Sequence, residues 1–235
     1  MKSRLLFFFW ILQPLTGWCQ VNDAGLWTEI ALEQPVNKDL SFELSEELRL
    51  NENCTEIGTA FTQFGVDYDI MKHLKAGIAY RFVQKRKIED FYSFRHKWIA
   101  ELTYKYKLKK FSTTLRTRYT RQYADMQSSE DGYVPAEYFR TRLGFEYDFS
   151  KHLSSYLSGE VFFNISPGKE NLPDQLRFAC GLEYSFSKKS AIEVGYLIDK
   201  EQYVENPTTG YIVTLSYSYK LDTLKKKKKK SDVME

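Results

Sequence analysis

Arginine and glutamate recur at every second position in several segments of the sequence. In RTRLGFEYDF (residues 140–149), Arg140, Arg142, Gly144, Glu146 and Asp148 share one parity, and the other parity holds only Thr and apolar residues. Charged side chains in such an array can pair with one another, or form rings that select small solutes. Their chemistry depends on the medium that the charged face contacts.

Thirteen charged residues follow this alternation and are the candidate site residues. They are Glu47, Arg49, Arg81, Arg95, Glu101, Arg116, Arg118, Arg140, Arg142, Glu146, Glu160, Arg177 and Glu183. Glu43, Lys75, Lys97 and Glu193 have the same parity. Because an isolated charge inside a narrow barrel is costly to desolvate, we expect these arginines and glutamates to pair. Two interpretations stay open, a lumen filled by its own salt bridges and a narrow water-filled pore with charged rings.

The histidines give little support for catalysis. His73 and His152 occupy equivalent short turns, and His96 lies in the phrase SFRHKW. Ser93 precedes His96 by three residues, so it points to the other face of a strand. No G-x-S-x-G phrase occurs. We expect no catalytic residue and no enzymatic activity, with a lipid-modifying enzyme that uses His96 as its base as the minor alternative.

Metal, cofactor and disulfide sites are not indicated. No two histidines share a strand face, and SSEDG (residues 128–132) is typical of a solvated surface loop. Cys54 falls in a loop, Cys180 falls within a strand, and no C-x-x-C spacing occurs. We expect no metal, no cofactor and no disulfide between these two cysteines.

Alternation of period two extends along the chain and predicts β-strands. The predicted strands are 24–34, 40–51, 57–70, 73–86, 92–107, 111–123, 136–149, 153–165, 174–186, 190–203 and 209–220. Most of them reach the ~9–11 residues that a tilted strand needs to cross a bilayer.

The predicted connections alternate between short and long. Four of the short connections occur in similar phrases, which begin at Tyr68, Tyr106, Tyr147 and Tyr184. These tyrosines are 38, 41 and 37 residues apart, so each repeat corresponds to one hairpin. The long ones are 52–56, 87–91, 124–135, 166–173 and 204–208. Sorting of this kind is typical of a bacterial outer-membrane barrel, with short periplasmic turns and longer outer loops. A secreted soluble β-sandwich is the competing fold.

The predicted fold is a single antiparallel transmembrane β-barrel of about 10–12 strands. Eleven segments conflict with the even number usual for single-chain bacterial barrels. Either segment 24–34 is not a full wall strand, which leaves ten, or a twelfth strand remains unassigned. With short turns in the periplasm, the last strand runs inward and ends there.

The chain divides into three parts. A basic start, an apolar run LLFFFWIL and Gly17 before a cut ahead of Gln20 predict a cleaved signal peptide over residues 1–19. Bulky Trp18 argues against a lipoprotein at Cys19. The barrel covers residues 20–221. Residues 222–235, with six consecutive lysines, are a predicted disordered periplasmic tail.

The composition suits a barrel and a soluble β-sandwich alike. Aromatic residues make up 16% of the chain. Removing the two cations of the signal segment and the six tail lysines changes the formal net charge from +3 to −5. The basic character therefore belongs to the tail, and nucleic-acid binding is not expected.

Several phrases resemble a known family. WTEIALEQPVNKDLSFELSEELRL, AYRF, FRHKW, FRTRLGFEY, LSGEVFF and LRFACGLEY are similar to domain-of-unknown-function family 2490, a group of uncharacterised Bacteroidetes outer-membrane proteins. The resemblance covers about 24–220. It singles out Trp27 and Tyr80 besides charged positions given above, and it implies a barrel but no activity.

The sequence thus predicts a protein of the bacterial cell outer membrane, exported through its signal peptide. Its role is structural or that of a narrow passive channel with an Arg/Glu lumen, or that of an interaction scaffold acting through outer loops such as 124–135. Expected partners are outer-membrane lipid, the barrel-insertion machinery and, for a channel, small solutes. The oligomeric state is open.

Overall fold

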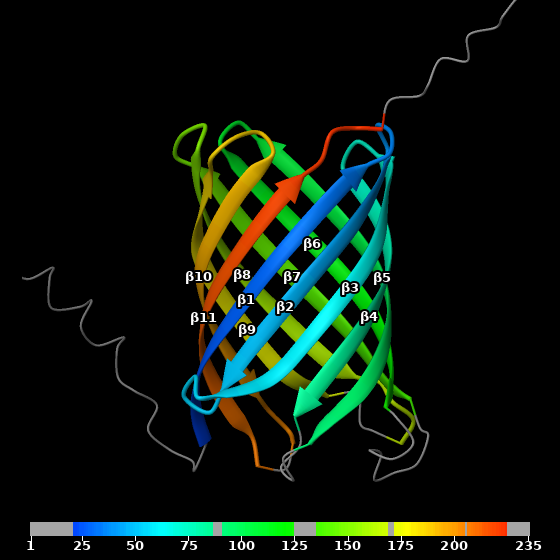
Figure 1. Ribbon diagram of the computed structural model, residues 1–235, viewed down its shortest axis with the longest axis vertical. Coiled ribbons are helices and arrows are strands. Elements are labelled where there is room, and N and C mark those ends of the chain that lie inside the picture. Colours follow the sequence, from blue (N-terminus) through cyan, green and yellow to red (C-terminus); the bar gives the residue numbers. More distant parts are fainter. Residues whose placement is uncertain (1–20, 87–90, 125–134, 169–171, 205, 225–235) are drawn as a thin grey trace, which may run out of the picture.

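The computed structural model describes residues 21–86, 91–124, 135–168, 172–204 and 206–224. Within these ranges the chain forms eleven strands (Figure 1). They are β1 (Val21–Pro35), β2 (Leu40–Asn51), β3 (Glu56–Met71), β4 (Leu74–Arg86), β5 (Tyr92–Leu108), β6 (Phe111–Ala124), β7 (Ala136–Asp148), β8 (Leu153–Asn164), β9 (Pro173–Ser185), β10 (Ser190–Glu201) and β11 (Thr208–Lys220). Among the described residues there is no helix suited to crossing a membrane.

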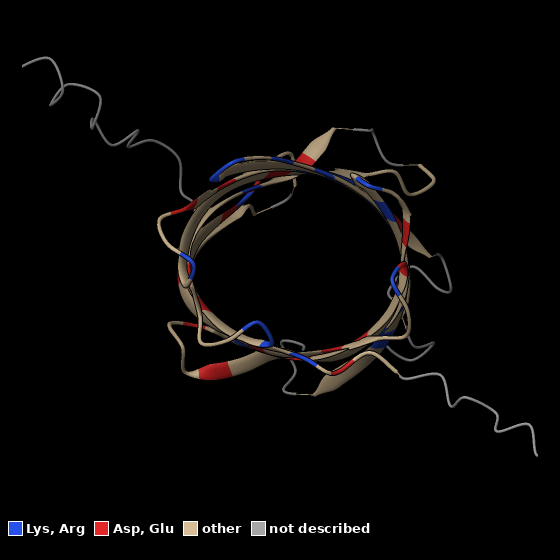
Figure 2. Ribbon diagram, turned by 90° about the horizontal axis from the view of Figure 1, so that it is seen from above, with Lys and Arg blue, Asp and Glu red and all other residues tan. Residues whose placement is uncertain are grey.

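The strands form one closed barrel in chain order. Each neighbouring pair from β1–β2 to β10–β11 is antiparallel, and the ring is complete when seen along its axis (Figure 2). The all-β barrel predicted from the alternating pattern is confirmed. The candidate signal peptide 1–19 and the lysines of the tail lie outside the described residues.

The eleven strands fall within the predicted 10–12, and the closing pair explains the odd number. β1 pairs with β11 in parallel, from Val21↔Thr208 to Glu33↔Lys220. An even number of strands is needed only when every neighbouring pair is antiparallel, and one parallel pair removes that condition. The segment 24–34 is therefore part of a full wall strand, and neither the ten-strand nor the twelve-strand alternative is correct.

The two ends of the barrel differ. The turns of residues 36–39, 72–73, 109–110, 149–152 and 186–189 share one end, called here the short-turn end. The other connections share the opposite, long-loop end. Because the strand number is odd, β1 starts at the long-loop end and β11 finishes at the short-turn end, as the two parallel arrows show (Figure 1).

The wall has an apolar outer face. Ile78, Trp98, Leu157 and Phe178 are more than half exposed although they lie within strands. Aromatic side chains such as Tyr106, Tyr147, Tyr184 and Tyr219 extend this face to the short-turn end. Alternation fixes the register, because a slip of one residue would turn this face into the interior.

The parallel seam is reinforced at the short-turn end. Lys220 Nζ lies 2.7 Å from Glu33 Oε1, and the Leu221 amide donates to the Glu33 carbonyl at 2.8 Å. Lys189 Nζ reaches Asp222 Oδ1 at 2.7 Å, and this hydrogen bond raises the pKa of the Lys189 ammonium. The chain beyond β11 thus ties the ends of β1, β10 and β11 together.

Candidate functional site

The inner face of the wall carries all thirteen candidate charges. Phe61 is 4% exposed and Val83 is 3% exposed, so their parity marks the interior of β3 and β4. The pairings Glu47↔Phe61 and Val83↔Arg95 then place Glu47 and Arg95 inside. Following the register around the ring places the other eleven on the same face.

A cavity of about 290 Å³ occupies the middle of the lumen. Every strand except β5 contributes to its lining, which only a cavity inside the ring allows. Its charged lining residues are seven arginines and four glutamates, namely Arg49, Arg81, Arg116, Arg118, Arg140, Arg142, Arg177, Glu29, Glu43, Glu47 and Glu193. We call the seven arginines the arginine belt.

Glu160 is the most buried carboxylate next to the belt, at 7% exposure. Its Oε1 lies 3.6 Å from Arg116 Nη2 and 3.8 Å from Arg140 Nε, and its Oε2 lies 3.8 Å from Arg177 Nη1. One carboxylate thus faces three guanidinium groups at distances too long for hydrogen bonds.

Three closer pairs complete the network. Arg118 Nη2 lies 2.5 Å from Glu101 Oε2, and Arg177 Nη2 lies 2.7 Å from Asp199 Oδ2. Arg49 Nε reaches Glu47 Oε1 at 2.6 Å. Charge-assisted contacts of this length are the strong ones, so these three arginines are held in fixed orientations.

Aromatic rings support the guanidinium groups. Arg49 lies 3.7 Å from the Trp27 ring centroid, and Arg81 lies 3.9 Å from the Phe61 centroid. Arg140 and Arg177 both lie over Phe162, at 4.9 and 4.8 Å. Such stacking favours a cation that has lost water.

Buried apolar side chains face the lumen in the half of the barrel nearer the long loops. The six buried ones come from β3, β4, β5, β8, β10 and β11, and each lies in the half of its strand nearer the long loops. They are Phe61, Val83, Ile99, Phe162, Leu197 and Ile212, all at most 7% exposed. We call them the apolar layer.

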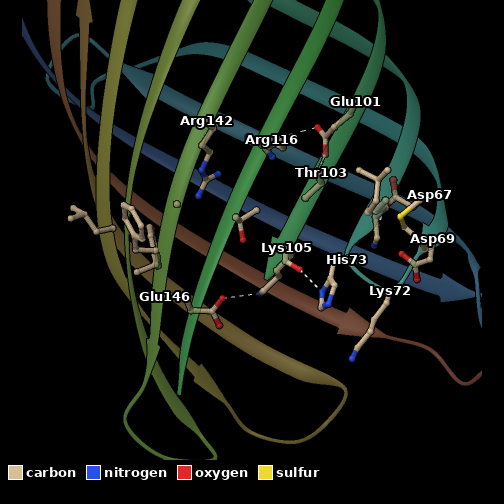
Figure 3. A pocket seen from close by; sticks show the side chains of 18 residues that line it. Asp67, Asp69, Lys72, His73, Glu101, Thr103, Lys105, Arg116, Arg142 and Glu146 are labelled. Atoms are coloured by element: carbon tan, nitrogen blue, oxygen red, sulfur yellow. Dashed lines mark hydrogen bonds and ion pairs between the residues drawn. The ribbon is translucent and has the colours of Figure 1, made fainter. Parts of the chain in front are cut away.

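The short-turn side of the lumen is more open. A cavity of about 490 Å³ lies there, with Lys72, His73 and Lys105 at its mouth and Arg116 and Arg142 deeper in the barrel (Figure 3). It shares Arg116, Arg142 and Tyr156 with the central cavity.

Glu146 and Glu183 belong to this half of the lumen rather than to the belt. Lys105 Nζ lies 2.8 Å from Glu146 Oε2, and Ser112 Oγ donates to the same oxygen at 3.1 Å. Glu183 lines a separate cavity beside the 186–189 turn.

Some cations have no carboxylate partner among the described residues. Arg95, Lys97 and Arg142 make no ion pair there, and Arg81 bonds only the neutral Gln63, at 2.6 and 2.9 Å. Glu29, Glu43 and Glu193, which line the same cavity, make no ion pair in the described part of the chain either.

Sequence reasoning missed several residues of this site. Asp199, Gln63, Phe61 and Phe162 share the inward parity of charges on their own strands, and that parity was the available signal. Glu29 was missed because segment 24–34 had no certain place in the wall.

The histidines lie away from the belt. His96 is on the outer face, where its Nδ1 lies 2.5 Å from the Tyr80 hydroxyl, whereas Ser93 faces inward and is 3% exposed. His73 Nδ1 and His152 Nδ1 each bond a backbone carbonyl of the next hairpin, at 3.0 and 2.8 Å. These contacts explain the histidine in two of the four repeated turn phrases.

Cys54 and Cys180 are both free and exposed, Cys54 beside the long loops and Cys180 on the outer face. In the part of the chain that the structure describes, no group of three His, Cys, Asp or Glu side chains could hold a metal ion. The acidic loop 128–132 is outside that part.

Comparison with known proteins places the chain in a family. Similar solved structures include the beta domain of the Bordetella autotransporter Brka, at 9% identity and TM-score 0.49, covering 77% of this chain and 82% of that one. The siderophore receptor PirA from Pseudomonas aeruginosa is similar at 10% identity and TM-score 0.29, covering 72% and 34%. No curated protein matches. The model of a family described as "Protein of unknown function (DUF2490)" matches residues 24–210, which confirms the resemblance, and the chain belongs to that family.

Proposed function

We propose that the protein is an outer-membrane barrel with a sealed lumen, which serves the membrane structurally and not as a through-pore. The apolar outer face supports the membrane location, because exposed Ile78, Trp98 and Phe178 within strands suit lipid. In this proposal residues 1–19 are a cleaved signal peptide. The short turns and the lysine tail face the periplasm, and the long loops face outward.

The apolar layer carries the proposal of a sealed lumen. A water-filled channel would wet inward side chains along its whole length, yet Phe61 and Phe162 are only 4% and 6% exposed. Arg81 and Arg140 lie against these same rings, so the layer is packed from the belt side as well. The lumen is therefore a cup that opens at the short-turn end.

A narrow passive channel is the second candidate. The observation in its favour is that the mouth cavity and the central cavity share Arg116, Arg142 and Tyr156, which makes a path through half the barrel. A channel would need that path to continue past the apolar layer.

We assign the protein no enzymatic activity, since His96 and Ser93 lie on opposite faces of β5. Its partners are outer-membrane lipid and the barrel-insertion machinery, with no role for nucleic acid. An interaction scaffold that acts through loop 124–135 is a separate candidate, and residues 125–134 of this loop lie outside the described ranges.

Efflux from liposomes tests the seal. Barrel folding is checked first by the different gel mobility of unboiled and boiled protein. Liposomes that contain the folded protein are expected to release chloride and small sugars as slowly as protein-free liposomes do. Release that rises in proportion to the amount of folded protein would establish the channel instead.

A further inference from the structure

We propose that the arginine belt binds a small polyvalent oxyanion, one that carries phosphate or carboxylate groups, and that this ligand enters from the short-turn end. This inference requires the barrel but not the seal. It assigns a ligand class to the central cavity, whereas the proposed function concerns only whether the lumen conducts.

Two cross-strand pairs of arginines occupy adjacent inward positions on β6 and β7. Arg116 of β6 is directly opposite Arg142 of β7, and Arg118 is directly opposite Arg140. Like charges opposite each other on neighbouring strands destabilise a sheet. Two arginine pairs in adjacent inward positions therefore need negative charge close by.

The carboxylates of the chain supply only part of that charge. Glu101 lies 2.5 Å from Arg118 and 3.9 Å from Arg116. Glu160 lies 3.6 Å from Arg116 and 3.8 Å from Arg140. Among the described residues Arg142 has neither a hydrogen bond nor an ion pair. Within ion-pair distance these four arginines thus share two carboxylates, and none of the four glutamates that line the cavity forms an ion pair with them.

The arginine belt also contains buried hydrogen-bond donors that lack an acceptor. The buried Nε atoms of Arg116, Arg140 and Arg177 have no hydrogen-bond acceptor among the described residues. Buried polar groups are nearly always paired, and a cluster of orphan donors calls for an acceptor. Guanidinium forks match the oxygens of phosphate and carboxylate groups in a bidentate manner.

Space and access fit a small ligand. The central cavity of about 290 Å³ is near the lower limit of small-molecule pockets. Arg142 lines both this cavity and the mouth cavity, and Figure 3 shows its side chain among those that line the mouth cavity. The mouth cavity is lined by five cations, Lys72, Lys75, Lys105, Arg116 and Arg142, and by four carboxylates, Asp67, Asp69, Glu101 and Glu146, so its charge is close to balanced with a small positive excess.

Calorimetric titration of the folded barrel in detergent tests the site, with inorganic pyrophosphate and citrate as probes and spermidine as the cationic control. We expect saturable binding of at least one anion and none of spermidine. Arg142→Gln is expected to weaken anion binding about tenfold or more, because it removes charge-assisted hydrogen bonds. Arg121→Gln is the matched control, since Arg121 lies on the outer face of β6 and pairs with Glu137 at 3.4 Å.

Folding is verified for each variant by gel mobility. If Arg142→Gln does not fold, Arg142→Lys keeps the charge and removes the fork, and its affinity should fall below that of the wild type. Folded wild-type protein that binds neither anion would overturn the proposal, as would an equal loss in Arg121→Gln and Arg142→Gln. Liposome efflux does not depend on these results, so failure of the anion site and failure of the seal are separable.

Discussion

Glu33 of β1 and Lys220 of β11 close the barrel side by side, with Glu33 Oε1 2.7 Å from Lys220 Nζ at the end of a parallel ladder. Two strands that run the same way must begin at the same end. The start of β1 therefore lies at the long-loop end, opposite the end of β11. In an even-stranded antiparallel barrel both chain ends would lie together.

The free cysteine in the β2–β3 loop makes this orientation testable in cells. If the long loops face outward, a membrane-impermeant maleimide should label Cys54 in intact cells, and a tag placed before Val21 should be reached by antibody. Cys180 on the lipid-facing side should stay unlabelled, and Cys54→Ser should abolish the signal. Ser187→Cys at the short-turn end should react only after the outer membrane is opened. The reverse pattern would invert the orientation.

Removal of the central carboxylate should destabilise the barrel. Glu160→Gln leaves Arg116, Arg140 and Arg177 facing a neutral group, and breaking a buried ion pair typically costs about 3–5 kcal/mol. The free energy of unfolding, measured by urea titration in lipid, should fall by that amount. Glu33→Gln is the control, because its partly exposed pair should be worth only about 0.2–1 kcal/mol. Equal losses of unfolding free energy in the two variants would show that the ion pairs of Glu160 stabilise the barrel no more than the exposed Glu33–Lys220 pair does.

A charge on the outer face should report the lipid contact. Phe178→Arg places a guanidinium near the middle of β9, where a lipid-facing charge costs about 2–4 kcal/mol. Leu172→Arg lies just before β9, at the edge of the barrel, where the cost should be about 0–1 kcal/mol. Urea unfolding in bilayers measures both. A water-exposed outer face predicts no difference between them.

Truncation of the apolar layer should open the lumen. Phe61→Ala with Phe162→Ala removes two rings that pack against Arg81 and Arg140. We expect discrete ion conductance in planar bilayers from this double variant. Phe178→Ala with Leu182→Ala removes comparable volume from the outer face and should stay silent. Silence in both folded variants would place the closure elsewhere.

The strands were predictable because alternation is a local property. Segment 40–51 was predicted with its observed bounds, and 111–123 differs from β6 by one residue. The parallel closure was not predictable, since Val21 and Thr208 are far apart in sequence and no turn phrase joins them. The rule of even strand number therefore misled the interpretation of segment 24–34.

The site was predictable in its chemistry more than in its pairing. Parity alone assigned Arg140 and Glu160 to one face, and the structure places both in the lumen. The choice of partners depends on how side chains reach across strands, as when Arg116 of β6 reaches Glu160 past β7. Inward Phe61 and Phe162 were hidden because the aromatic residues of a barrel are expected to face lipid.

Single-channel recording of the folded wild-type protein in a planar bilayer tests the central claim most directly. A lumen sealed by the apolar layer predicts a silent bilayer, with insertion confirmed by recovery of heat-modifiable protein. Discrete conductance steps that change with Arg142→Gln would contradict the seal, and would show instead an open pore lined by the arginine belt.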